Sequence, residues 1–271
     1  MRAGAVLMLV CMASCGEGGG GTSDGGGGEQ AANDNGVTLT VLAASSLTDA
    51  FEELAQTFEK ENPGVTVRQS FGASSTLLAQ IQQGAPSDVF ASASEGEMNT
   101  AVKKELVGRK PKIFAKNREI IMVPKENPAG IEEFRDVARP GVRLVLAEEH
   151  VPAADYAGEI LGKANGEYGG DFEQKVLDNV VSREADVRAA VNRVVVGDAD
   201  ATFGYASDHT PDIRDRVDVV TIPSELNIVA TYPVAVLGDA QEPGLAREWV
   251  DLVTGEEGQR VLEKWGFEPA A

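Results

Sequence analysis

The sequence has little positive charge and very little cysteine or histidine. Its 271 residues include 24 Lys and Arg against 43 Asp and Glu, which gives a formal net charge of −19. A nucleic-acid-binding protein needs a basic face, and this composition offers none, so we expect no nucleic-acid partner. The two histidines have no paired His or Cys spacing around them, so we predict no site for a metal cation. An acidic protein of this kind must use local hydrogen-bond donors if it is to bind an anion.

Long apolar runs are also missing, apart from a short one at the N-terminus. The segment MRAGAVLMLVCMASC has one Arg, an apolar stretch to Val10 and small residues before Cys15. This pattern is typical of a secretion signal, and it is too short for a membrane-spanning helix. Because MASC resembles the lipobox of bacterial lipoproteins, we interpret 1–14 as a signal peptide and Cys15 as the lipidated residue. An ordinary secretory signal that is cleaved further on is the alternative.

A glycine-rich segment follows the signal. Residues 16–28 contain nine Gly among thirteen and no apolar side chain, so they can bury nothing and predict a flexible tether. We assign 15–36 to the lipidated cysteine and this tether. The expected location is extracytoplasmic, at the outer face of the cytoplasmic membrane, with the lipid anchor as the only membrane contact. Since Cys11 would leave with the signal, we expect no disulfide in the folded part.

Strands and helices alternate from Val37 to the C-terminus, which predicts an α/β fold with mostly parallel sheets. Hydrophobic residues make up 42% of the chain, enough for a core. The β-branched runs and the helical spacing of apolar residues predict these elements in order. The strands are 37–43, 65–71, 87–93, 119–124 and 142–147, then the segments ATFGYA, VDVVTI and YPVAVL; the helices are 47–58, one within the stretch 71–84, 96–106, 131–138, 153–163, 171–179, 185–196 and 244–265, the last broken near Gly255.

Serines occupy two successive turns from strand to helix. Ser45 and Ser46 follow the strand 37–43, and Ser74 and Ser75 follow the strand 65–71. Ligands of open α/β sheets bind beyond the carboxyl ends of the strands, where these turns lie. A helix N-terminus adds unpaired N–H groups and the positive end of the helix dipole, which together make an anion site. For either turn alone, a serine that only caps its helix is the alternative.

Both turns are rich in Ala and Gly and contain no Asp. A carboxylate cap would repel an anion, whereas serine leaves the pocket neutral. Two turns with the same chemistry therefore favour an anion site over simple capping.

Ordered segments across residues 37–267 resemble the molybdate-binding proteins of bacterial ABC importers. The segments are VLAASSLTDAFEELAQTFEKENPGVTV, FGASSTLLAQIQQGAPSDVFASAS, EHVPAADYA, EADVRAAVNRV, FGYASD, YPVAVL and KWGF. The resemblance implies the two-lobed fold of type II periplasmic binding proteins, each lobe a mostly parallel sheet flanked by helices. It implies one lobe of residues 37–116 and 223–271, a second of residues 117–222, and a ligand in the cleft between them.

The resemblance also implies the residues that bind the ligand, because the family holds molybdate or tungstate with neutral hydrogen-bond donors. Carried over residue by residue, the donors are the hydroxyls of Ser46, Ser74 and Tyr205 and the backbone N–H groups of Ala153 and Val187. Ser45 and Ser75 are additional candidates. The stretch between Ala153 and Val187 is longer than in the family, and NGEYGGDFE is interpreted as a loop insertion.

The resemblance implies a solute-binding protein that is not an enzyme, needs no cofactor, acts as a monomer and delivers molybdate and tungstate to an ABC permease. A hydrolase that uses one of the serines would need a base, and only His150 and His209 are available. The segment GASST lacks the second Gly of the G-x-S-x-G nucleophile motif. A binding protein of the same fold for sulfate, phosphate or a metal is the other alternative.

Overall fold

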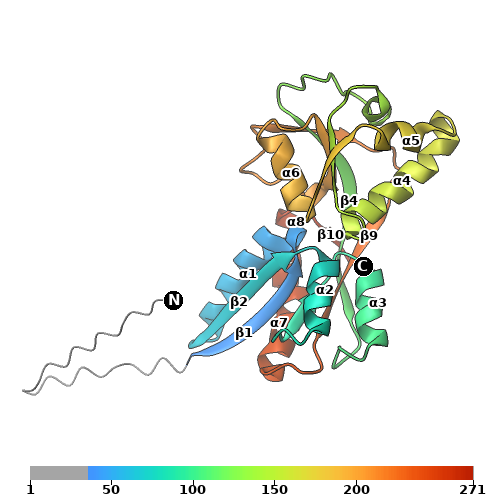
Figure 1. The fold of residues 1–271 in the computed structure, drawn as a ribbon. Helices are drawn as coiled ribbons and strands as arrows, with labels where there is room; N and C mark the ends of the chain where they lie inside the picture. Colours follow the sequence, from blue (N-terminus) through green and yellow to red (C-terminus); the bar gives the residue numbers. More distant parts are fainter. Residues whose placement is uncertain (1–35, 271) are drawn as a thin grey trace, which may run out of the picture. The chain divides into compact units, whose positions relative to one another are not determined.

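The computed structural model describes residues 36–270, which form two lobes joined by shared strands (Figure 1). The predictions for the signal peptide, Cys15 and nearly all of the tether lie outside these residues. The strand order is β2-β1-β3-β9-β4-β7-β5-β6, with β10 and β8 paired to β4. Within residues 36–270 no helix is long and apolar enough to span a membrane. The expected α/β class is confirmed.

The first lobe is built on three parallel strands and two antiparallel ones. Strands β2, β1 and β3 run in parallel, and β9 and the first part of β4 continue the sheet in the antiparallel direction. The strands are β1 (Val37–Ala44), β2 (Val65–Gly72), β3 (Val89–Ala91), β4 (Lys112–Pro124), β9 (Val229–Val236) and β10 (Glu268–Pro269). The helices are α1 (Thr48–Glu61), α2 (Ser74–Gln82), α3 (Glu95–Lys103), α7 (Pro243–Thr254) and α8 (Glu256–Lys264), with a 3-10 turn, η1 (Ser45–Leu47), before α1.

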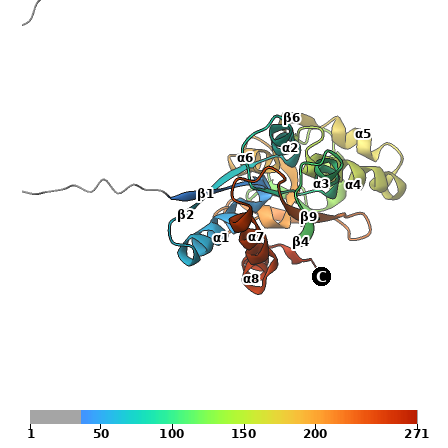
Figure 2. The same ribbon diagram turned by 90° about the horizontal axis from the view of Figure 1, so that it is seen from below.

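Helices cover both faces of the first-lobe sheet. Figure 2 shows α1, α7 and α8 on one face and α2 and α3 on the other, in agreement with two separate hydrophobic clusters. Trp249 of α7 makes edge-on contacts with Phe51 and Phe58 of α1, with ring centroids 5.5 Å apart in both pairs. Each such contact contributes about 0.5–1.5 kcal/mol beyond burial of the rings. The aromatic cluster therefore fixes α1 against the sheet, and with it the turn that precedes α1.

The second lobe repeats this plan with a smaller sheet. The second part of β4 pairs with β7 and β8 in the antiparallel direction, and β7, β5 and β6 run in parallel. Helices α4 and α5 cover one face of the sheet, and α6 covers the other. The elements are β5 (Leu144–Ala147), β6 (Val180–Glu184), β7 (Ala201–Tyr205), β8 (Val217–Thr221), α4 (Pro152–Tyr168), α5 (Phe172–Leu177), α6 (Val187–Val195), η2 (Phe134–Ala138) and η3 (Ala206–Asp208).

Strand β4 belongs to both lobes. It pairs with β9 as far as Arg118 and with β7 from Glu119 onward. The chain passes between the lobes a second time between β8 and β9. Because these connecting strands run against their neighbours, the sheet contains more antiparallel pairing than the sequence pattern suggested.

The structure differs from the predicted elements at several places, among them the helix predicted at 131–138, which is the shorter 3-10 helix η2. The strand predicted at 119–124 begins at Lys112, because its first half alternates exposed Lys and Arg with buried residues and lacks a continuous apolar run. Strand β6 was not predicted, since it is a half-exposed edge strand. The segment NGEYGGDFE is not a loop insertion: α4 continues to Tyr168 and α5 begins at Phe172, where the two rings lie 5.0 Å apart and both contact Phe134.

Asp88, the residue before β3, has a structural role in the first lobe. Its two carboxylate oxygens accept hydrogen bonds from the backbone N–H of Thr40, at 2.7 Å, and of Glu242, at 2.9 Å. The side chain is 2% exposed, and both acceptors are used inside the first lobe. Asp88 therefore joins β1 to the segment before α7 and contributes no free carboxylate to the cleft.

Candidate functional site

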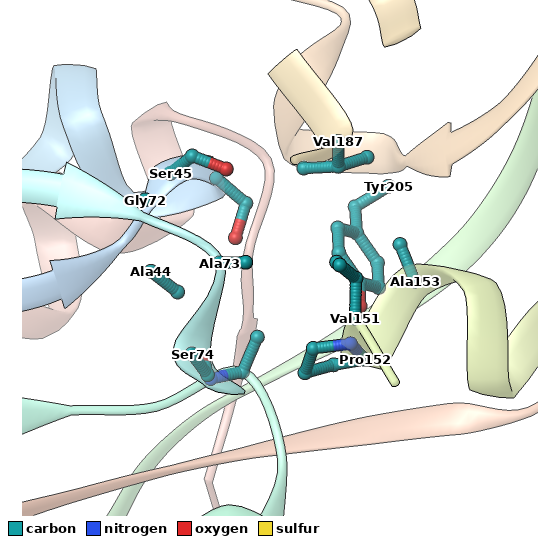
Figure 3. A pocket seen from close by; sticks show the side chains of 12 residues that line it. Ala44, Ser45, Gly72, Ala73, Ser74, Val151, Pro152, Ala153, Val187 and Tyr205 are labelled. Atoms are coloured by element: carbon teal, nitrogen blue, oxygen red, sulfur yellow. The ribbon is translucent and has the colours of Figure 1, made fainter. Parts of the chain in front are cut away.

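A small pocket lies between the two lobes, where several helices begin (Figure 3). It surrounds about 200 Å³ of space that no atom occupies. The lining residues are small or apolar apart from three serines and a tyrosine: Ala44, Ser45, Ser46, Gly72, Ala73, Ser74, Ala93, Val151, Pro152, Ala153, Val187 and Tyr205. None of the twelve carries a charge, so any ligand held here is bound by neutral groups.

The structure brings all five principal candidates into this one pocket. Ser46 and Ser74 line it from the first lobe, and Ala153, Val187 and Tyr205 line it from the second. Ser45 lines it as well. Ser75 does not, although it follows Ser74 directly in α2. Ser46 and Tyr205, which are 159 positions apart in the sequence, therefore share one cavity.

Helix α2 begins at the pocket without a side-chain cap. Its N-cap residue is Ala73, which has no side-chain acceptor, and Ser74 is the first helical residue. The first N–H groups of a helix have no acceptor inside the helix, so those of α2 are open to the cavity. The alternative in which the serine of this turn caps its helix is therefore not what the structure shows. The same holds at α1, where the N-cap Leu47 makes no side-chain cap bond.

Helices α4 and α6 also begin at the pocket, from the second lobe. In α4 the N-cap is Val151 and the first helical residue is Pro152, so the N–H of Ala153 is the first one that the helix presents. In α6 the side chain of Asp186 accepts a hydrogen bond from the N–H of Ala189 at 3.1 Å. The N–H of Val187, the first helical residue, takes no part in that bond. The positive dipole ends of both helices therefore face the same cavity as α2.

The two principal serines are held in place by bonds to protein groups. The backbone N–H of Ala93 donates to Ser74 Oγ over 3.0 Å, which leaves the hydroxyl proton of Ser74 free to donate elsewhere. Ser46 Oγ and Tyr232 Oη are 3.0 Å apart, and either hydroxyl can be the donor. Both serines are buried, at 2% and 1% exposure for Ser46 and Ser74. The first-lobe half of the pocket is thus preformed.

Tyr205 differs from the serines because its hydroxyl has no partner. The side chain is 1% exposed, and within residues 36–270 no hydrogen-bond partner lies within reach of Tyr205 Oη. Burial, with smaller effects of nearby Tyr and acidic side chains, raises the pKa of the phenol well above its usual value. The hydroxyl therefore stays protonated and is a neutral donor whose natural acceptor would be a ligand in the pocket.

The nearest cation, Arg188, is committed to other groups. Its Nη2 lies 2.5 Å from Asp49 Oδ2 on α1, and its Nε lies 2.7 Å from Asp208 Oδ1 in an ion contact without hydrogen-bond geometry. Arg188 does not line the pocket, and neither does Arg68, which is exposed on β2. The Arg188–Asp49 ion pair joins the lobes across the cleft, from α6 to α1.

Two tyrosines of the site region were missed from the sequence. Tyr232 supports Ser46, and Tyr156 of α4 donates to the carbonyl of Ala93 over 3.3 Å, across the cleft. Tyr232 lies in the segment YPVAVL, which carries the family resemblance, but its partner depends on how β9 is placed next to β1 and β3. No pattern of residue types along the chain shows that placement.

The pocket is poorly equipped for catalysis. Its lining contains no His, Asp, Glu, Lys or Cys, so a serine nucleophile would have no base within the cavity. His209 lies next to Val217 in the second lobe, with Nε2 3.3 Å from that carbonyl, and His150 is exposed. The described residues contain no group of three or more His, Cys, Asp or Glu that could hold a metal ion. What the arrangement can do is surround a small ligand with hydrogen-bond donors.

Comparisons with known proteins place the chain in a family. Residues 39–268 match the family model of bacterial extracellular solute-binding proteins. The molybdate-binding protein ModA of Mycobacterium tuberculosis is 36% identical over 85% of this chain and 84% of its own. The substrate-binding domain of a putative molybdenum ABC transporter from Clostridium difficile has 28% identity and a TM-score of 0.64, over 87% of this chain and all of that one.

The fold extends to more distant proteins. The sulfate-binding protein SubI of M. tuberculosis, at 21% identity, has a TM-score of 0.77 over 86% of this chain and 87% of its own, which shows the shared type II periplasmic binding protein fold. The resemblance that the ordered sequence segments predict is confirmed by the closer relatives. The chain belongs to the family of bacterial extracellular solute-binding proteins.

Proposed function

We propose that this protein captures molybdate, and tungstate as a close analogue, and delivers it to the permease of an ABC importer. One observation carries the proposal: uncapped helix N-termini and neutral hydroxyls from both lobes meet in a single pocket without a charged side chain. The relatives named as molybdate-binding proteins give the ligand its identity. The donors that we assign to the oxyanion are those predicted from the sequence: Ser46, Ser74, Ala153, Val187 and Tyr205, with Ser45 in addition.

A tetrahedral dianion suits this lining. Each of its four oxygens can accept more than one hydrogen bond, and bonds to an ionised acceptor are shorter and stronger than neutral ones. Helix N-termini favour negative charge, which removes the need for Lys or Arg in the cavity. A cavity lined by donors alone also rejects an anion that carries its own proton, because that hydroxyl would find no acceptor.

Sulfate is the second candidate, because proteins of this fold include a sulfate-binding one. Sulfate has the same charge and shape as molybdate, but its S–O bonds are shorter than Mo–O bonds. A rigid cavity therefore separates the two by size alone. We place molybdate first because the more similar relatives are named for it.

Lobe closure would complete the site. We propose lobes of residues 37–116 with 223–271 and of 117–222, with β4 and the segment between β8 and β9 as the hinge. This division is supported by the change of pairing partner along β4, from β9 up to Arg118 to β7 from Glu119. We further propose a monomer, exported and held at the membrane by a lipid on Cys15. Mass spectrometry of the mature N-terminus tests the anchor, and an unmodified chain that begins after residue 20 would contradict it.

Titration calorimetry with molybdate, tungstate, sulfate and phosphate tests the ligand. The proposal predicts tight 1:1 binding of molybdate and tungstate, at least about a hundredfold weaker sulfate binding and no phosphate binding. Equal affinity for sulfate would favour the second candidate. No binding of any of the four anions would contradict an oxyanion site.

A further inference from the structure

Glu119 is a buried carboxyl group without a partner. It lies on β4, at the residue where this strand stops pairing with β9 and starts pairing with β7. The side chain is completely buried, at 0% exposure. Neither of its carboxyl oxygens has a hydrogen-bond partner, and no cation within residues 36–270 pairs with it. Nothing in the binding site described above accounts for this residue.

The strand register places Glu119 behind the pocket. Glu119 and Tyr205 are directly opposite each other in the antiparallel pair of β4 and β7, so their side chains leave the sheet on the same face. The next residues of that face on β4, Ile121 and Val123, pack beneath α4. Glu119 therefore lies between the strand and the N-terminal half of α4, next to the tyrosine whose free hydroxyl lines the cavity.

The ionisable groups around Glu119 offer no positive charge. The groups linked to it by charge are Asp208 in η3, Tyr205 on β7 and Tyr156 on α4. Arg188 is engaged with Asp49 and Asp208. Burial, and to a smaller degree the Asp208 carboxylate, raises the pKa of Glu119 well above its usual range. The side chain is thus a neutral carboxylic acid at the pH where an ordinary Glu is ionised.

We propose that Glu119 is a positioning residue for anion capture whose proton is part of the binding equilibrium. This inference rests on the proposed function. As a neutral acid, Glu119 leaves the field of the helix N-termini undiminished, whereas its carboxylate would put a negative charge behind the oxyanion. Because coupling is reciprocal, the bound anion holds the proton on Glu119, and loss of that proton weakens anion binding.

The pH dependence of molybdate affinity tests the inference. In the wild type, the molybdate affinity measured from about pH 6 upward is constant while Glu119 keeps its proton, and it falls by up to about tenfold per pH unit once Glu119 ionises. Glu119→Gln keeps the shape and neutrality of the acid, so the molybdate affinity of this variant stays constant over the pH range in which that of the wild type falls. The tyrosines do not titrate there, since burial raises the pKa of Tyr156 to about 12 and that of Tyr205 well above its usual value. Glu126→Gln, at an exposed carboxylate beyond the end of the same strand, is the matched control and should follow the wild type.

A second readout needs no ligand. When the pKa of an acid is higher in the folded state than in the unfolded state, the folded state holds the extra proton between the two pKa values. The free energy of unfolding therefore decreases as pH rises through that range. Glu119→Gln should therefore melt at a higher temperature than the wild type at neutral pH, and the difference should vanish in acid. In the binding experiment, a wild-type molybdate affinity that stays constant from about pH 6 to about pH 10 would overturn the inference. A Glu119→Gln affinity that falls together with that of the wild type would overturn it as well. With either of these results, molybdate binding at about pH 6 would leave the proposed function intact. Absence of molybdate binding at that pH would contradict the proposed function.

Discussion

The two lobes contribute different kinds of donor to the same pocket. The first lobe supplies serine hydroxyls that already have protein partners, Ala93 N–H for Ser74 and Tyr232 for Ser46. The second lobe supplies the backbone N–H groups of Ala153 and Val187 and the unpartnered hydroxyl of Tyr205. We infer that the first lobe is a finished half-site that receives the anion, and that the second lobe is satisfied only by a bound ligand. Mutations that are confined to one half of the pocket test this difference.

A charge placed in the first-lobe half should have the largest effect. Ser74→Asp puts a carboxylate against the anion, and like charges about 4 Å apart cost about 4 kcal/mol at the dielectric typical of proteins, or a loss of affinity of roughly a thousandfold. The matched control is Ser75→Asp, one residue further along and outside the lining. It should bind molybdate within about threefold of the wild type in calorimetry. If the two variants lose binding equally, Ser75 also faces the ligand and the assigned lining is wrong.

Removal of one backbone donor from the second lobe should have the next largest effect. Val187→Pro deletes an N–H at the first position of α6, where proline is well tolerated, and the extended Asp186 before it suits a following proline. We expect a loss of about 1.5–3 kcal/mol in molybdate binding, because the lost bond is to a charged acceptor.

The control for that variant is Val187→Ala, which keeps the N–H and trims only the side chain. Its affinity should stay near that of the wild type. Similar losses in the two variants would show that the Val187 side chain, and not its N–H, matters for binding.

Deletion of the Tyr205 hydroxyl should have a smaller effect, and it should change molybdate binding without changing stability. Tyr205→Phe removes a donor that has no protein partner, so we expect a loss of about 1–2 kcal/mol in affinity and no loss in the free energy of unfolding. Calorimetry and urea unfolding measure the two quantities. Tyr168→Phe, on the far end of α4, is the control. A clear loss of stability in Tyr205→Phe would mean that this hydroxyl serves the fold.

The bridge between the lobes should give the smallest effect. Asp49→Asn removes the partner of Arg188 on the first lobe, and pairs that are about a quarter exposed are worth about 0.2–1 kcal/mol. Stopped-flow kinetics should show faster molybdate release with little change in the rate of capture, and less sensitivity of release to salt than in the wild type. Asp218→Asn, in an ion pair within the second lobe, should change neither rate.

The same contrast explains what the sequence could and could not predict. Serines at two strand-to-helix turns are visible as residue types at fixed places, so local chemistry predicts the pairs Ser45–Ser46 and Ser74–Ser75, and the family resemblance selects Ser46 and Ser74. Ala153 and Val187 are proposed to bind through N–H groups that almost every residue has, so only a resemblance to a family points to them. The neighbours of Glu119 and Tyr232 depend on strand register across the lobes, which no local pattern encodes.

The secondary structure could likewise be predicted only where the pattern is local. The strongly periodic helices and buried strands were predicted close to their observed bounds, including the break between α7 and α8 near Gly255. The edge strand β6 and the first half of β4 were missed because exposed positions interrupt their apolar pattern. The continuation of α4 past Gly166 depends on packing of Tyr168 and Phe172 against Phe134, a tertiary contact that overrides the glycine-rich sequence.

The most direct test of the central claim is a crystal structure with tungstate, whose anomalous scattering locates the metal atom without assumptions. We predict one strong peak in the pocket, with tungstate oxygens within hydrogen-bond distance of Ser46 Oγ, Ser74 Oγ, Tyr205 Oη and the N–H groups of Ala153 and Val187. A peak bound elsewhere, or one that is held by Lys or Arg side chains, would contradict the account.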